Sequence, residues 1–139
     1  MRMRPVLESE DIRRMAAAAR AEADKNGWNV AIVIVDEAGN LQYAERTGNS
    51  EGGTGCEVAM AKARSAALTR QPTKTLEDRL KERPGFQRFL DDRRLLQIQG
   101  GLPLIYNGTC VGAIGVSGRP SADDETVAAA GVAALEAAK

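Results

Sequence analysis

The sequence predicts a single α+β domain, residues 1–139, in which about five mostly antiparallel strands are flanked by helices. A length of 139 residues suits one domain with its own hydrophobic core. Two pairs of short apolar segments are each joined by a turn, as in β-hairpins, and helical segments separate the two pairs. Hairpins that are linked through helices assemble into a mostly antiparallel sheet with helices on its faces.

The overall composition argues against two classes of partner. The chain carries 19 basic and 19 acidic residues, and only 4% of its residues are aromatic. Nucleic-acid binding needs a basic surface and aromatic stacking platforms, so we expect no nucleic-acid partner. No apolar run approaches the roughly 18 residues of a transmembrane helix, so we expect no membrane partner. The first residues lack the apolar segment of a signal peptide, which predicts a cytoplasmic protein.

The first half of the chain predicts a helix followed by a hairpin. Apolar residues at helical spacing begin after Ser9, which suits a helix cap, and Asn26-Gly27 ends the pattern. Residues 28–35 are apolar and β-branched, so we expect a strand that is buried on both faces. A turn at 36–40 then returns the chain as a second strand, 41–46.

Three helices and a short strand are predicted next. Thr54 and Glu57 fit a capping box that opens a helix over residues 55–69. A second capping box, at 75–78, predicts a short helix, and Pro84 suits the first turn of another. Residues 95–98 are predicted to form a short strand.

The last part of the chain predicts a second hairpin and a final helix. Asn107-Gly108 separates two apolar segments, 102–106 and 109–116, and favours a type I′ turn between them. Ser121 and Asp124 fit a third capping box, which opens an alanine-rich helix.

Several short segments, spread over nearly the whole chain, occur together in one known family. They are the strand 30–36 with Gly39, Arg46, the alanine-rich helix around Lys62, Pro72-Thr73 with Thr75-Leu76, residues 100–104, Asn107-Gly108, residues 111–118, and Asp124. On these segments the chain resembles the GlcG/HbpS family, which includes the C-terminal domain of PduO-type proteins. The combination of Gly-Gly-x-Pro with Gly-x-Ile-Gly-Val-Ser-Gly is the most specific part of this resemblance.

The resemblance implies an antiparallel sheet flanked by helices, assembly into homo-oligomers from dimers to octamers, and a small-molecule ligand. Some members of the family bind haem, and others are encoded with enzymes of small-molecule catabolism. The sequence contains no histidine, the commonest axial ligand of haem, which disfavours haem as the cofactor here. The remaining side chains that could bind the iron are Tyr43, Tyr106, Cys56, Cys110 and the methionines.

Three residues are candidates for ligand binding. Arg46 ends a strand before a glycine-rich loop, and its guanidinium could hold a carboxylate in bidentate fashion; the alternative is a structural arginine. Gly100 and Gly101 could present backbone N–H groups to an anion. The alternative for this pair is a strand kink or a positive φ angle.

Two residues are candidates for catalysis. Lys62 lies among alanines, where a desolvated amine could act as a base or a Schiff-base nucleophile; the alternative is an ion pair with an acid. Asp124 could move a proton, although the capping box gives it a structural role. Two cysteines without a histidine predict no metal site. Both cysteines are expected to be free thiols.

Two functions therefore stay open at this point. One is a binding protein for a small anionic metabolite or a tetrapyrrole. The other is a cofactor-free isomerase, tautomerase or lyase that acts on a small carboxylate. A subunit that works only through assembly is a third, weaker hypothesis.

Overall fold

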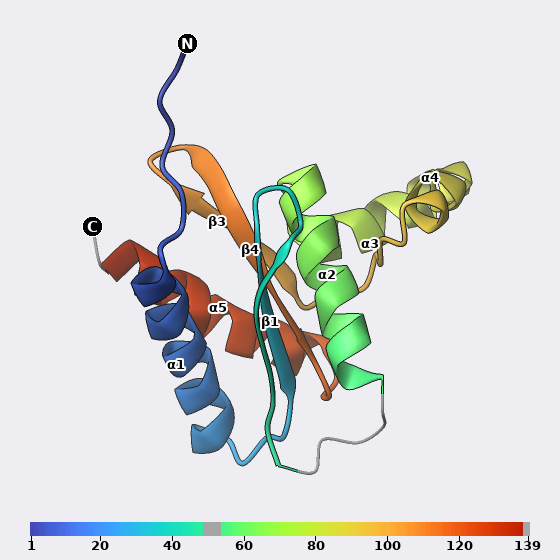
Figure 1. Cartoon of the computed structure of the whole chain (residues 1–139). Coiled ribbons are helices and arrows are strands. Elements are labelled where there is room, and N and C mark those ends of the chain that lie inside the picture. Colours follow the sequence, from blue (N-terminus) through green and yellow to red (C-terminus); the bar gives the residue numbers. More distant parts are fainter. Residues whose placement is uncertain (49–53, 138–139) are drawn as a thin grey trace.

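The chain forms a four-stranded antiparallel sheet with the strand order β2-β1-β4-β3, and it is described here from a computed structural model that covers residues 1–48 and 54–137 (Figure 1). The strands are β1 (Ala31–Asp36), β2 (Leu41–Arg46), β3 (Gly101–Tyr106) and β4 (Thr109–Ser117). The predicted α+β class and antiparallel sheet are confirmed.

The predicted count of five strands is wrong, because residues 95–98 form no strand. The backbone N–H groups of Leu95 and Leu96 donate to residues outside the sheet. The N–H of Leu95 donates to the Leu90 carbonyl oxygen at 2.9 Å, and the N–H of Leu96 donates to Ser65 Oγ at 2.7 Å. The segment is therefore tied to the helices rather than to a strand.

Helices cover both faces of the sheet. Helices α1 (Ser9–Lys25) and α5 (Ser121–Ala137) pack together on one face, and α2 (Gly55–Thr69) packs on the other (Figure 1). Alternate residues of β1 enter the two resulting cores, with Ile32 and Ile34 facing α1 and α5 and Val33 facing α2. In the described part of the chain, no helix is long and apolar enough to cross a membrane.

A short helical arm stands out from the body beyond α2. It consists of α3 (Thr73–Glu82), the 3-10 turn η1 (Pro84–Phe86) and α4 (Gln87–Asp92) (Figure 1). The rings of Phe86 and Phe89 stack at 5.1 Å, and Leu90 is buried. Pro84 begins the turn, as predicted.

Several of the predicted helix starts are wrong in detail. Glu8, not Ser9, caps α1, in a capping box in which the Glu8 N–H donates to Asp11 Oδ2 at 2.9 Å. Helix α3 begins at Thr73, directly after Pro72, before the predicted box at 75–78. Helix α2 has the predicted bounds, but the side chain of Thr54 makes no cap bond. At α1, Glu8 and Ser9 are both polar, and the reciprocal bonds with Asp11 select Glu8. At α3, Pro72 stands before the first turn, where its missing N–H costs no helical hydrogen bond.

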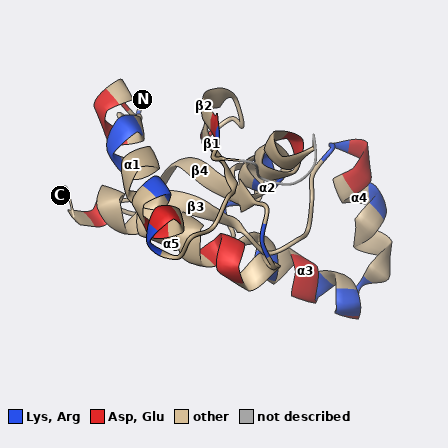
Figure 2. Ribbon diagram, turned by 90° about the horizontal axis from the view of Figure 1, so that it is seen from below, with Lys and Arg blue, Asp and Glu red and all other residues tan. Residues whose placement is uncertain are grey.

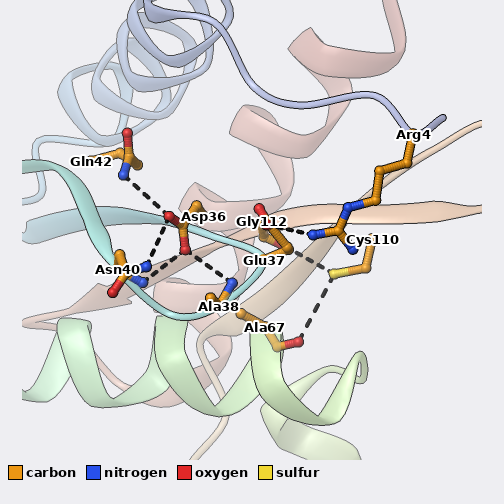
Figure 3. Close-up of polar contacts among 9 residues, drawn as sticks. All are labelled: Arg4, Asp36, Glu37, Ala38, Asn40, Gln42, Ala67, Cys110 and Gly112. Atoms are coloured by element: carbon orange, nitrogen blue, oxygen red, sulfur yellow. Dashed lines mark hydrogen bonds and ion pairs between the residues drawn. The ribbon is translucent and has the colours of Figure 1, made fainter. Parts of the chain in front are cut away.

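Both predicted hairpin turns are present. Asn107 and Gly108 have φ angles of 48° and 79°, as a type I′ turn requires. Between β1 and β2, Asp36 Oδ1 accepts the N–H groups of Ala38 and Asn40, each at 2.9 Å (Figure 3). The Asp36 carboxylate therefore shapes its own turn.

Helix α2 lies almost in backbone contact with β4, and Gly115 makes this approach feasible. A Cβ at Gly115 would overlap the carbonyl oxygen of Ala59 and lie 2.6 Å from the Ala63 nitrogen. Strands β3 and β4 carry no charged residue, which suits this close packing (Figure 2). The sheet and α2 therefore meet through small side chains.

We expect Gly115→Ala to destabilise the protein by about 3 kcal/mol, because the added methyl group meets backbone atoms that cannot move aside. Urea unfolding followed by circular dichroism measures this. Gly85→Ala is the matched control, since a Cβ at Gly85 would have no neighbour within 4 Å. Equal stability of the two variants would contradict the close approach of α2.

Candidate functional site

The two predicted catalytic residues, Lys62 and Asp124, form a buried ion pair. Lys62 lies in α2 and Asp124 in the first turn of α5, on opposite faces of the sheet. Lys62 Nζ lies 3.1 Å from Asp124 Oδ2 and donates to the Val116 carbonyl oxygen at 2.9 Å. The two side chains are only 3% and 2% exposed. The ammonium is thus held between two acceptors at the end of β4.

Asp124 also fixes the loop that leads into α5. Its Oδ1 accepts the N–H of Arg119 at 2.9 Å. Ser121 is the first residue of α5 rather than its cap, so the predicted capping box with Asp124 is wrong. Burial raises the pKa of the Asp124 carboxyl above its ordinary value, whereas the Lys62 ammonium and the Arg119 N–H act in the opposite direction.

Gly100 and Gly101 lie directly against Lys62. Gly100 has a φ angle of +132°, and a Cβ there would lie 2.8 Å from both Lys62 Nζ and the Val116 carbonyl oxygen. The Gly101 N–H donates to Thr73 Oγ1 at 2.9 Å, and the Gly100 carbonyl accepts the Val116 N–H at 3.0 Å. In this conformation the glycine pair makes room for the lysine, and the Gly101 amide already has a partner.

Arg46 lies at the same end of the sheet but outside this cluster. It pairs with Ala31, which pairs on its other side with Ser117. Two strand spacings separate Arg46 from β4, a distance of about 10 Å. The Arg46 side chain is exposed and makes no hydrogen bond or ion pair with the described residues. The structure therefore brings together four predicted site residues, Lys62, Asp124, Gly100 and Gly101.

A groove that the sequence analysis did not predict lies between β2 and α2. Its volume is about 220 Å³. Its lining is formed by Val33, Leu41, Ala44, Cys56, Glu57 and Met60. Cys56 and Met60 are one helical turn apart, so both sulfur atoms belong to the side of α2 that faces β2. The groove thus combines apolar walls and two sulfur-containing residues with one acidic residue, Glu57.

Arg46 belongs to the sheet face that carries this groove. Residues that pair in antiparallel strands point to the same face, and the Arg46 partner Ala31 packs in the α2 core. Ala44, two residues earlier on β2, lines the groove itself. Alternation along β2 therefore places Arg46 about 7 Å beyond Ala44 on the same face. The positively charged side chain of Arg46 therefore lies near one end of the groove.

Two patterns in the sequence indicate which residues could line this groove. Cys56 and Met60 have i, i+4 spacing in a correctly predicted helix, and the alternation of β2 separates Ala44 and Arg46 from Tyr43 and Glu45. What the sequence did not supply was the packing of that helix beside β2. Both cysteines are free thiols, with Cys56 half-buried and Cys110 buried. Within residues 1–48 and 54–137, no three His, Cys, Asp or Glu side chains could hold a metal ion together.

Comparison with known proteins defines the family. The family model of the haem degrading protein HbpS-like group matches residues 7–133. The chain belongs to the HbpS-like family. It is 33% identical to Protein GlcG of Escherichia coli strain K12 over 117 residues, which is 84% of this chain and 85% of GlcG. The resemblance on the quoted motifs is confirmed.

Solved structures agree with this HbpS-like assignment. A double mutant of Streptomyces reticuli HbpS is 34% identical, with a TM-score of 0.86 over 97% of this chain and 90% of that chain. A complex of PduOC with haem is 25% identical, with a TM-score of 0.85 over 94% of this chain and 95% of that chain. The sheet and its flanking helices are therefore shared with solved members of the family.

Removing one partner of the Lys62–Asp124 pair leaves a buried charge uncompensated. We expect Lys62→Met and Asp124→Asn each to lower the free energy of unfolding by about 3–5 kcal/mol. The double variant should lose clearly less than the sum, because neither charge is then left alone. Chemical denaturation of the four proteins measures this coupling.

Lys74→Met is the matched control for these variants. Lys74 pairs with Asp78 at 2.9 Å on the surface, where its side chain is 43% exposed. An exposed pair of this kind contributes about 0.5 kcal/mol. If Lys62→Met costs no more than Lys74→Met, the buried pair does not hold the two helices together.

Proposed function

We propose that this HbpS-like chain binds a flat, apolar ligand with carboxylate groups, a tetrapyrrole of the haem class, in the groove between β2 and α2. One observation carries the proposal. The same sheet face presents an apolar groove, two sulfur donors and the guanidinium of Arg46, which has no partner among the described residues. Arginine binds carboxylates through two parallel hydrogen bonds, as the acidic side chains of a tetrapyrrole require.

The donor atoms of the groove fit a haem iron better than Tyr43, which points to the opposite face of the sheet, toward α1 and α5. The Tyr43 hydroxyl donates to Glu45, and burial together with that carboxylate raises the pKa of Tyr43 to about 12. Its phenolate is therefore scarce at neutral pH. Cys56 and Met60 line the groove, and cysteine thiolate and methionine thioether are both established types of haem ligand.

Each part of the groove has a stated task in this proposal. Val33, Leu41 and Ala44 would cover part of the ring and exclude water from it. A groove of about 220 Å³ holds one edge of such a ligand rather than enclosing it. Bound haem would supply the redox chemistry of its iron. The PduOC structure with haem, on the same fold, supports this class of ligand.

Titration with ferric haem tests the proposal. We expect a saturable Soret band at micromolar haem, and a Cys56→Ser variant should shift its position because the sulfur ligand is lost. Arg46→Ala should raise the dissociation constant about tenfold, the effect of one charged hydrogen-bonded pair. Iron-free protoporphyrin, followed by fluorescence, separates binding in the groove from ligation of the metal.

Arg88→Ala is the control for this titration, because Arg88 is an exposed arginine on α4, far from the groove in sequence and fold. It should bind haem like the wild type. Absence of any saturable spectral change, or equal affinity in Arg46→Ala and Arg88→Ala, would remove the proposed site.

The catalytic function stays a prediction. A cofactor-free enzyme would use Lys62 or Asp124 to move a proton on a small carboxylate, and the Lys62 ammonium would first have to leave Asp124 and Val116. Deuterium exchange into a panel of small carboxylic acids, followed by NMR, tests this. Lys62→Met should abolish exchange. Equal exchange in wild type, Lys62→Met and Asp124→Asn would reject both assigned roles.

A further inference from the structure

We propose a second binding site, for a small organic dianion with two carboxylates, in a cavity at the opposite end of α2. The cavity lies between the N-terminal segment, the end of α2 and the turn that joins β3 to β4, and its volume is about 500 Å³. Arg2, Arg4 and Arg70 all line it, together with the apolar surface of Met3 and Ile105. Pockets of this size hold small metabolites.

The charge of this cavity is unbalanced. Three arginine residues line it, and no acidic residue does. Arg4 is partly neutralised, because its Nη2 lies 2.6 Å from Glu37 Oε1 (Figure 3). Arg2 and Arg70 make no hydrogen bond or ion pair with the described residues. Two cations therefore remain for a ligand, and two carboxylates would match them.

The backbone of Arg70 has a left-handed conformation. Arg70 follows α2 as its C-cap with φ 59° and ψ 30°, a conformation that glycine normally occupies at this position. Arg94 has a similar φ of 53°, so it is the place of Arg70 in the cavity wall, and not its backbone, that distinguishes it. The partial negative charge at the helix end favours one arginine, but it does not account for three around one cavity.

The apolar residues of the cavity indicate the chemistry of the part of the ligand that joins its two carboxylates. Ile105, Met3 and Cys110 line the same cavity and supply apolar surface, which suits the hydrocarbon spacer of a dicarboxylate better than a bare inorganic ion. Cys56 and Arg70 are fourteen positions apart, which corresponds to about 21 Å along a helix, so this cavity and the β2–α2 groove are separate sites. The inference does not depend on haem binding.

Calorimetric titration of the full chain, with any tag at its C-terminus, tests the site. The probes are succinate, glutarate, propionate and inorganic phosphate. We expect saturable binding of succinate or glutarate, binding at least tenfold weaker for propionate and phosphate, and a loss of at least tenfold in affinity in Arg2→Ala and in Arg70→Gly. Tighter binding of phosphate than of both dicarboxylates would overturn the ligand class.

Arg94→Gly provides a closely matched control. Arg94 also has a positive φ, 53°, and is exposed, but it does not line the cavity. Glycine relieves backbone strain at both positions, so both variants should melt at a higher temperature than the wild type. Only Arg70→Gly should lose the dicarboxylate. Equal affinity in the two glycine variants, or no saturable heat at millimolar dicarboxylate, would overturn the proposal.

Discussion

The ion pair between Lys62 and Asp124 is the constraint on which the arrangement of this fold depends. The pair joins α2 and α5, which lie on opposite faces of the sheet, around the end of β4. Because the charges are buried, each must keep its partner, and this fixes the position of one helix relative to the other. The glycine at position 100 follows from it, since a side chain there would displace the ammonium. Both proposed binding sites are built on the helix that this pair anchors.

Helix α2 serves two sites because its ends have different neighbours. Its first turns lie beside β2, where Cys56 and Met60 face apolar residues of the sheet. Arg70, which follows its last residue, lines a cavity together with the N-terminal segment and the β3–β4 turn. Between these ends, Gly115 lets the helix rest almost on the backbone of β4. The close contact of α2 with β4 is thus confined to the middle of the helix, and a cavity lies near each of its ends.

Local patterns in the sequence predicted most helices and strands correctly. They failed for residues whose interaction partner is distant in the chain. The bounds of α2 and the Asn107-Gly108 turn follow from neighbouring residues and were correct. Asp124 was given a local cap with Ser121, whereas its carboxylate pairs with a lysine 62 residues away. Residues 95–98 have strand-like composition, but Ser65 takes one of their backbone bonds. The groove was missed because it arises from packing between elements.

The groove beside β2 follows from the unequal cover of the two sheet faces. Three strand spacings make the sheet about 14 Å wide, whereas one helix with its side chains is about 10 Å across. Two helices, α1 and α5, can cover one face, but α2 covers the other alone and is centred on β4 and β1. The outer strand β2 therefore keeps Leu41 exposed and Ala44 uncovered. The apolar surface that a ligand would bury is the part of the sheet that a single helix is too narrow to reach.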